Sequence, residues 1–151
     1  MEHCILAVFK TNYRVTWFDI DAAQVVHHSN YFRIFQRAEE EFYEHLGLGS
    51  SYNYFAEHGI WLPRTKVFCR YKVPSRLGYT LEIFLTVREI REKSIRYGFL
   101  ARKKDTDITV AEGYVVAVAT DKRIGKPINI PFEILEKLKV FKRNRLKHEV
   151  Q

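Results

Sequence analysis

Residues 31–46 place apolar side chains at steps of three and four positions, which is the pattern of a helix that buries one face. Ser29 and Asn30 precede this stretch as candidate N-caps, and Gly47 follows it as a candidate stop. Charged and amide side chains fill the intervening positions and predict a solvated opposite face. The apolar stripe of this expected helix consists of Tyr31, Ile34, Phe35, Ala38, Phe42 and Leu46.

The other patterned segments favour β-strands. Residues 5–18 are rich in β-branched and aromatic side chains, with Tyr13, Val15 and Trp17 on one face. A short second helix is expected over residues 51–58, and a closing helix is expected to begin near Pro131, a residue suited to a first helical turn. Turn-forming residues separate four later strand segments, at 61–73, 80–91, 94–103 and 108–120.

One long striped helix and about five strands, in this order, predict an α+β fold: an antiparallel sheet of about five strands wrapped around the helix. The stripe has only that sheet to pack against. Strands at sheet edges invite pairing with a second copy, so we expect a homodimer or homotetramer. Neither a repeat nor a linker divides the chain, which predicts a single domain over residues 1–137, closing helix included, and a basic tail over 138–151.

Composition narrows the class of protein. Apolar residues make up 46% and charged residues 28%, as in globular proteins, and the longest apolar runs are too short to span a bilayer. The start of the chain lacks the pattern of a secretory signal. Cys4 and Cys69 have no metal or redox spacing and fit a reducing compartment. We therefore expect a cytoplasmic protein without a metal site.

Positive charge is concentrated in two regions of a chain with a formal net charge of +7. Residues 137–147 carry cations and no anion, which is typical of a solvated tail. No aromatic RNA-binding motif accompanies the tail, so a specific nucleic-acid partner is not expected, and contact with a membrane surface is the lesser alternative. The second region is suited to a polyanionic small ligand and contains Arg88, Arg91, Lys93, Arg96, Arg102, Lys103 and Lys104.

The segment from residue 18 to residue 31 carries the candidate chemistry. Asp19 and Asp21 end a strand, an apolar pair and two histidines follow, and the long helix then begins. A helix entry offers unpaired N–H groups and the positive end of the helix dipole. A carboxylate beside such donors suits thioester hydrolysis, because the donors hold the oxyanion while the carboxylate attacks or activates water. The residues alone leave open that the aspartates only cap a turn.

This segment resembles the signature of hotdog-fold acyl-CoA thioesterases of the 4-hydroxybenzoyl-CoA thioesterase type. The chain departs from the signature at Gln24, where the family has glycine, and at Trp17, where some members have tyrosine. The resemblance continues in order along most of the chain, through Tyr71, Pro74, Arg76, Gly78 and Leu81, then Lys93 and Ser94, then 111–113 and 116–118, and finally Ile130 and Pro131.

The resemblance implies a thioester hydrolase with Asp21 as the catalytic carboxylate, acting as nucleophile or general base. It also implies that the backbone N–H of His28 holds the thioester carbonyl and that the His28 side chain assists. The substrate is an acyl-CoA or aroyl-CoA, so no separate cofactor is expected. The expected substrate-binding and CoA-binding residues are Trp17, Tyr31, Arg91, Lys93, Ser94 and Arg96.

Alternatives to this interpretation stay open. A hotdog module that binds acyl-CoA without turnover needs the pocket but not Asp21. A dehydratase of the same fold is less favoured, because no matching histidine–glycine loop is present. The thioester carrier is either CoA or acyl carrier protein. Another hotdog branch uses a helix carboxylate, but Glu39, Glu40 and Glu41 are predicted to form a solvated helix face, with Glu39 bordering the stripe.

Overall fold

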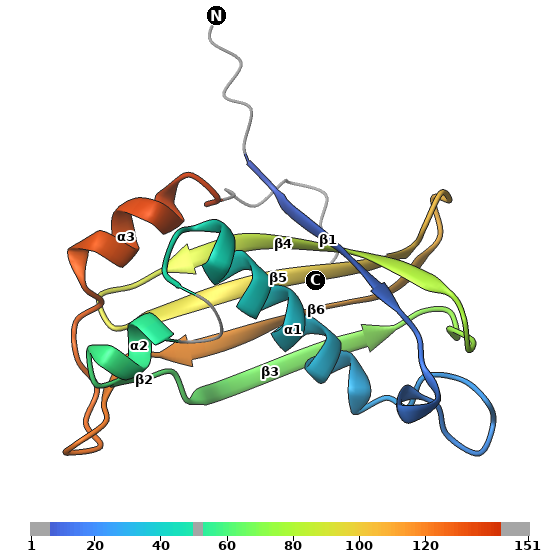
Figure 1. Ribbon diagram of the computed structural model, residues 1–151, viewed down its shortest axis with the longest axis horizontal. Coiled ribbons are helices and arrows are strands. Elements are labelled where there is room, and N and C mark those ends of the chain that lie inside the picture. Colours follow the sequence, from blue (N-terminus) through green and yellow to red (C-terminus); the bar gives the residue numbers. More distant parts are fainter. Residues whose placement is uncertain (1–6, 50–52, 143–151) are drawn as a thin grey trace, which may run out of the picture.

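Residues 7–49 and 53–142 are described by a computed structural model of the protein, in which one long helix packs on a five-stranded antiparallel sheet. Figure 1 shows helix α1 crossing one face of the sheet, with α3 near one end. The strand order is β1-β4-β5-β6-β3, and β2 and β7 form a small second sheet. This confirms the expected α+β hotdog fold. The elements are β1 (Phe9–Arg14), η1 (Trp17–Asp19), α1 (Asn30–His45), α2 (Asn53–Glu57), β2 (Ile60–Trp61), β3 (Arg64–Tyr71), β4 (Thr80–Ile90), β5 (Ser94–Lys103), β6 (Thr109–Val118), β7 (Thr120–Asp121) and α3 (Phe132–Lys139).

The bounds of α1 agree with the predicted helix to within one residue. Ser29 is its N-cap, although its hydroxyl contacts His27 instead of capping the helix. At the other end, Gly47 adopts a φ of +76°, a left-handed conformation that glycine tolerates without strain. The N–H of Leu48 then bonds back to the carbonyl of Tyr43, which ends the helix.

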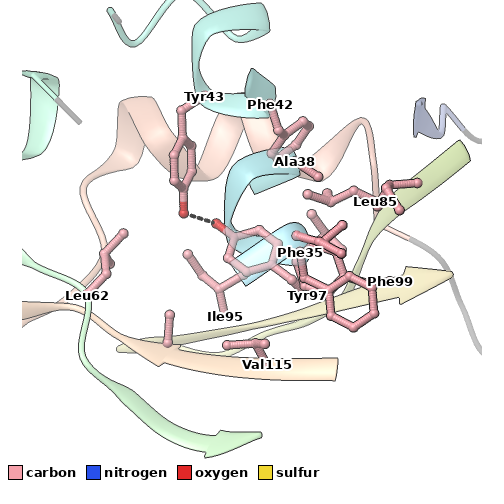
Figure 2. Close-up of a cluster of buried hydrophobic side chains, with 14 of the residues drawn as sticks. Phe35, Ala38, Phe42, Tyr43, Leu62, Leu85, Ile95, Tyr97, Phe99 and Val115 are labelled. Carbon is pink, nitrogen blue, oxygen red and sulfur yellow. Dashed lines mark hydrogen bonds between the residues drawn. The ribbon is translucent and has the colours of Figure 1, made fainter. Parts of the chain in front are cut away.

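The core lies between α1 and the three central strands. Alternate residues of β4, from Leu81 to Val87, are fully buried on the face toward the helix. Phe35 of α1 stacks on Phe99 of β5 with ring centroids 4.8 Å apart (Figure 2). Burying each such side chain contributes about 1.5–3 kcal/mol, so the helix stripe and the sheet face hold each other in place.

Two predicted strands differ from the observed ones. The strand expected over 5–18 ends at Arg14 and is followed by the short helix η1, while its first two residues lie outside the described part. The strand expected over 61–73 is divided into β2 and β3 by Leu62 and Pro63. Proline has no backbone N–H to donate, which accounts for a break at this point. Segment 108–120 likewise divides into β6 and β7.

Residues beyond 137, where the predicted domain ends, still pack against the core. Helix α3 runs to Lys139 with Pro131 as its N-cap, one position earlier than a first helical residue. Leu138 is fully buried, Phe141 is 8% exposed, and the N–H of Val87 bonds to the carbonyl of Phe141. The remainder of the basic tail, 143–151, lies outside the described residues. None of the helices described is long and apolar enough to cross a membrane.

Candidate active site

A tight hairpin formed by residues 19–27 joins η1 to α1. The N–H of Asp21 bonds to the carbonyl of Val25 at 2.9 Å, and the N–H of His27 bonds to the carbonyl of Asp19 at 2.9 Å. Gln24, in the turn, has a φ of +64°, a conformation that is uncommon for residues other than glycine. This conformation explains in physical terms why the related signature has glycine at the position of Gln24.

The hairpin is fixed to the end of the sheet through the β3–β4 connection. The N–H of Val26 bonds to the carbonyl of Ser75 at 2.8 Å, and Val25 forms a β-bridge with Arg76. The side-chain amide of Asn30, the first residue of α1, bonds to the carbonyl of Asp19 at 2.8 Å. Sheet, hairpin and helix entry therefore form one hydrogen-bonded unit.

The Asp19 side chain stabilises the loop that follows β1. Its side chain is buried and accepts hydrogen bonds from the Tyr13 hydroxyl at 2.8 Å, the Thr16 N–H at 2.8 Å and the Thr16 hydroxyl at 3.0 Å. These donors fold the chain into η1 just after β1. The carboxylate of Asp19 is thus used to hold the loop and is screened from solvent.

Asp21 is placed differently, half-buried at the start of the hairpin turn. Its Oδ1 accepts the N–H of Ala23 at 2.8 Å, which orients the carboxylate. Its Oδ2 accepts no hydrogen bond from residues 7–49 or 53–142. One oxygen is therefore held by the turn while the other is free to act on a ligand.

The backbone N–H groups at the entry of α1 differ in their partners. The N–H of Ser29 bonds to Nδ1 of His27 at 3.2 Å, and the N–H of Asn30 bonds to the carbonyl of His27 at 2.9 Å. The N–H of His28 makes no hydrogen bond within the described chain, although its carbonyl accepts the Tyr71 hydroxyl at 3.0 Å. A fixed peptide with a free N–H at a helix N-terminus is suited to hold a developing negative charge.

Side chains around the hairpin differ in exposure. Trp17 is 81% exposed on η1, whereas Tyr31 is 3% exposed and donates its hydroxyl to Ser75 at 3.1 Å. The exposed imidazole of His28 lies against His27, with ring centroids 4.1 Å apart, and edge-on to Tyr71. Trp17 and His28 are therefore accessible to a ligand in the isolated chain, while Tyr31 is buried. The substrate-binding roles of Trp17 and Tyr31 stay predictions.

The basic residues expected to bind CoA lie around the β4–β5 turn, whereas the 19–27 hairpin is bonded to the β3–β4 connection at the other end of β4 (Figure 1). Strand β4 has 11 residues, which corresponds to about 35 Å. Arg91 pairs with Glu89 at 2.7 Å, and the Arg96 guanidinium lies over the Tyr114 ring at 4.7 Å. Lys93 is exposed in the β4–β5 turn and Ser94 begins β5. A single chain does not bring this group to Asp21.

The structure contradicts the expectation that Glu39 belongs to a solvated helix face. Glu39 is 2% exposed and accepts the Tyr43 hydroxyl at 2.7 Å and the Arg64 guanidinium at 2.5 Å. The Tyr43 and Tyr97 hydroxyls are 2.8 Å apart (Figure 2). Burial raises the pKa of Glu39, and the charge of Arg64 opposes that shift. The burial of Glu39 could have been recognised from the sequence, because Glu39 follows Phe35 by four residues and therefore lies beside the buried stripe.

A cavity of about 380 Å³ lies beside this network, between α1 and the start of β3. All hydrogen-bonding oxygens of Glu39 are used by Tyr43 and Arg64, so the network mainly ties α1 to β3. No group of histidine, cysteine, aspartate or glutamate side chains within residues 7–49 and 53–142 is arranged to hold a metal ion. The cavity lining consists of Gln36, Glu39, Glu40, Tyr43, Leu62, Pro63 and Arg64.

Comparison with known proteins gives the family. Residues 15–138 match the model of the thioesterase-like superfamily. The acyl-CoA thioester hydrolase YbgC of Escherichia coli is 28% identical over 138 residues, covering 87% of this chain and 96% of that protein. A crystal structure of a hypothetical protein from Aquifex aeolicus has a TM-score of 0.78 and 31% identity, covering 86% of this chain and 98% of that one.

A 1,4-dihydroxy-2-naphthoyl-CoA thioesterase from Synechocystis shares the fold with a TM-score of 0.80 at 16% identity, over 88% of this chain and 96% of that one. The family model, the relatives and the solved structures agree with one another and with the hotdog architecture. Together they confirm the thioesterase resemblance seen in the signature segment. The chain belongs to the thioesterase-like superfamily.

Proposed function

We propose that this protein hydrolyses an acyl-CoA or aroyl-CoA thioester to the free acid and CoA at the 19–27 hairpin. Asp21 is the nucleophile or general base, and the His28 N–H holds the thioester carbonyl. One observation carries the proposal. The Asp21 carboxylate has one oxygen without a hydrogen bond, the His28 N–H also has none within the described chain, and both belong to one short segment held by hydrogen bonds. YbgC, which is named for acyl-CoA thioester hydrolysis, supports this substrate class.

The chemistry needs only these two groups and water. As a general base, Asp21 takes a proton from a water molecule that attacks the thioester carbon. As a nucleophile, Asp21 attacks that carbon itself and forms a mixed anhydride, which water then hydrolyses. In both routes the carbonyl oxygen becomes an oxyanion beside His28, and the CoA thiolate leaves and is protonated. One such N–H donor is worth about 2.7–4 kcal/mol of barrier.

Exposed apolar side chains around the hairpin support an acyl or aroyl substrate. Trp17 is 81% exposed and Phe18 is 80% exposed, both on η1 next to Asp19. Tyr71, Val73 and Leu77, at the β3–β4 end of the sheet, are each more than 40% exposed. Large exposed apolar side chains that gather around a reactive carboxylate are typical of a binding site for an apolar ligand.

Strand β3 is suited to self-association. It is one edge of the sheet and is largely exposed, with Val67 and Phe68 both more than 40% exposed. In an antiparallel pairing of two β3 strands, the Tyr71 end of one copy meets the Arg64 end of the other. The Arg64 end of the sheet also carries the start of β5, so the partner's basic turn would approach the Asp21 end.

We expect the protein to be at least a dimer in solution. Light scattering at micromolar concentration should give a mass of two or more 18.0 kDa chains. Unpaired backbone groups and exposed apolar side chains along β3 provide the driving force. A mass equal to one chain would contradict edge pairing and, with it, any contact between the basic turn and a ligand at Asp21.

The paired substitution of Lys93 and Arg96 by alanine should raise KM severalfold with little change in kcat. Cations that hold CoA phosphates stabilise the bound substrate and the transition state equally, so losing them raises KM but leaves the barrier from the bound complex, and therefore kcat, unchanged. The effect should shrink at high salt, where screening already weakens these contacts. Lys10→Ala, which removes a cation on β1, is the control. An unchanged KM at low salt would leave Lys93 and Arg96 without a role in binding.

The test of the proposed function is turnover of a panel of CoA thioesters with short, long and aromatic acyl groups. Release of the CoA thiol gives the rate, and calorimetry gives the affinity in parallel. We expect hydrolysis of at least one member of the panel. Tight binding of acyl-CoA with no thiol release would contradict the proposal and favour a binding module, and the same acyl group on acyl carrier protein distinguishes the two carriers.

A further inference from the structure

The peptide group that joins His28 to Ser29 is held at both of its edges by side chains. On one edge, the N–H of Ser29 donates to Nδ1 of His27 at 3.2 Å. On the other edge, the hydroxyl of Tyr71, the last residue of β3, donates to the carbonyl oxygen of His28 at 3.0 Å. The two side chains come from different elements, so this one peptide ties the entry of α1 to the sheet.

The entry of α1 has little other side-chain support at this point. Ser29 is the N-cap residue, yet its hydroxyl does not cap the helix and lies 2.7 Å from Nδ1 of His27. Its φ of −67° and ψ of −25° are helical, whereas an N-cap residue normally has an extended backbone. The position of the peptide after His28 therefore depends on the bonds from His27 and Tyr71.

The Tyr71 hydroxyl is presented by a rigid part of the molecule. Its residue pairs with Ala111 in the β3–β6 ladder, and its ring lies 5.5 Å from the ring of the buried Tyr31, whose hydroxyl bonds to Ser75. The Tyr71 ring also lies edge-on to the imidazole of His28. Partial burial raises the pKa of Tyr71, which keeps the hydroxyl protonated as a donor.

His27 is equally fixed. Its own N–H donates to the carbonyl of Asp19 at 2.9 Å, and its carbonyl accepts the N–H of Asn30 at 2.9 Å. Its ring lies against that of His28, with centroids 4.1 Å apart. Because Nδ1 accepts the Ser29 N–H, the proton of the neutral ring is on Nε2. The side chain thus acts as an acceptor that the backbone holds in place.

The N–H of His28 lies between these two held peptide groups. We propose that His27 and Tyr71 are positioning residues that aim this N–H at the thioester carbonyl, an inference that rests on the proposed function. They act through His28 and not on the substrate. An oxyanion donor is effective only at about 2.7–3.1 Å from the oxyanion, so losing either bond lets the donor move out of line. The donor is used most in the transition state, so the loss should lower kcat and leave KM nearly unchanged.

The test compares kcat and KM for variants that remove one bond each. His27→Phe keeps an aromatic ring beside His28 without an acceptor, and Tyr71→Phe keeps the ring without the hydroxyl. Each should lower kcat by about threefold to tenfold, the range for one neutral hydrogen bond. His27→Asn should restore kcat, because an asparagine oxygen accepts the N–H two residues further on. Tyr54→Phe is the matched control: it removes a tyrosine hydroxyl that bonds to Glu133 on α3 and should leave kcat unchanged.

Amide exchange at Ser29, followed by NMR, reports on the held peptide without any turnover. Exchange should quicken in His27→Phe and Tyr71→Phe and should return to the wild-type rate in His27→Asn. Quicker exchange with unchanged kcat, or a rise in KM as large as the fall in kcat, would overturn the positioning role and leave the proposed function standing. Absence of thiol release in the wild type would overturn the proposed function and the positioning role with it. Thermal unfolding checks that each variant is folded.

Discussion

Replacing Asp21 with asparagine should lower kcat for thioester hydrolysis by about a hundredfold or more, the usual contribution of a general base. Asparagine is nearly isosteric with aspartate, and its amide oxygen still accepts the Ala23 N–H that orients the side chain. The hairpin and the melting temperature should therefore be unchanged. Only the charge needed to attack a thioester or to remove a proton from water is lost, so kcat should fall more than KM changes.

Two neighbouring substitutions provide the contrast. Asp19→Asn should first lower stability, because the buried Asp19 carboxylate accepts hydrogen bonds from Tyr13 and from two groups of Thr16. His28→Ala should reduce kcat less than Asp21→Asn, since the backbone N–H that holds the carbonyl survives the change. Folded Asp21→Asn with full activity would remove Asp21 from the mechanism and direct attention to Glu39, the buried carboxylate of α1.

The second large effect is expected on stability. Glu39→Ala should lower the free energy of unfolding by about 3–5 kcal/mol, as when one partner of a buried ion pair is removed. The change leaves the Tyr43 hydroxyl and the Arg64 guanidinium without their acceptor and opens a void between α1 and β3. Urea denaturation at neutral pH measures the loss. Glu136→Ala, on the exposed surface of α3, should cost less than about 0.5 kcal/mol.

The pH dependence of Glu39 has a defined sign. Burial raises the pKa of this carboxyl in the folded chain above its ordinary value of 4.5. Between the unfolded-state pKa and the folded-state pKa, the folded state therefore binds more protons than the unfolded state. The contribution of Glu39 to stability is complete at lower pH and falls as pH rises through the folded-state pKa. Glu39→Gln, which cannot ionise, should lose this dependence and should cost less than Glu39→Ala. An identical pH profile in wild type and Glu39→Gln would contradict the shift.

Local patterns in the sequence were sufficient to predict the main elements. The helix stripe from Tyr31 to Phe42 and the alternation in β4 and β5 reflect burial against one partner, so their periods specify the elements. The 3-10 turn at Trp17 was missed because it depends on the buried Asp19 side chain accepting hydrogen bonds from Tyr13 and Thr16. Such side-chain contacts override the strand preference of aromatic residues.

The candidate site could be predicted only as far as it is local. Asp21 lies on the 19–27 hairpin and His28 directly follows it at the helix entry, so only six positions of the chain separate the two residues. The burial of Glu39 depends on Arg64, which is 25 residues away, so helix period alone did not reveal it. The distance of Lys93 from Asp21 is set by the length and direction of β4, which requires the sheet topology.

The position of a bound thioester tests the central claim most directly. A crystal structure with a CoA analogue in which a methylene group replaces the thioester sulfur would retain the carbonyl and resist hydrolysis. The mechanism predicts that this carbonyl oxygen lies about 2.7–3.1 Å from the His28 nitrogen, with the Asp21 carboxylate about 3–3.5 Å from the carbonyl carbon or one water molecule away. A carbonyl bound beside Glu39, or away from both Asp21 and His28, would contradict it.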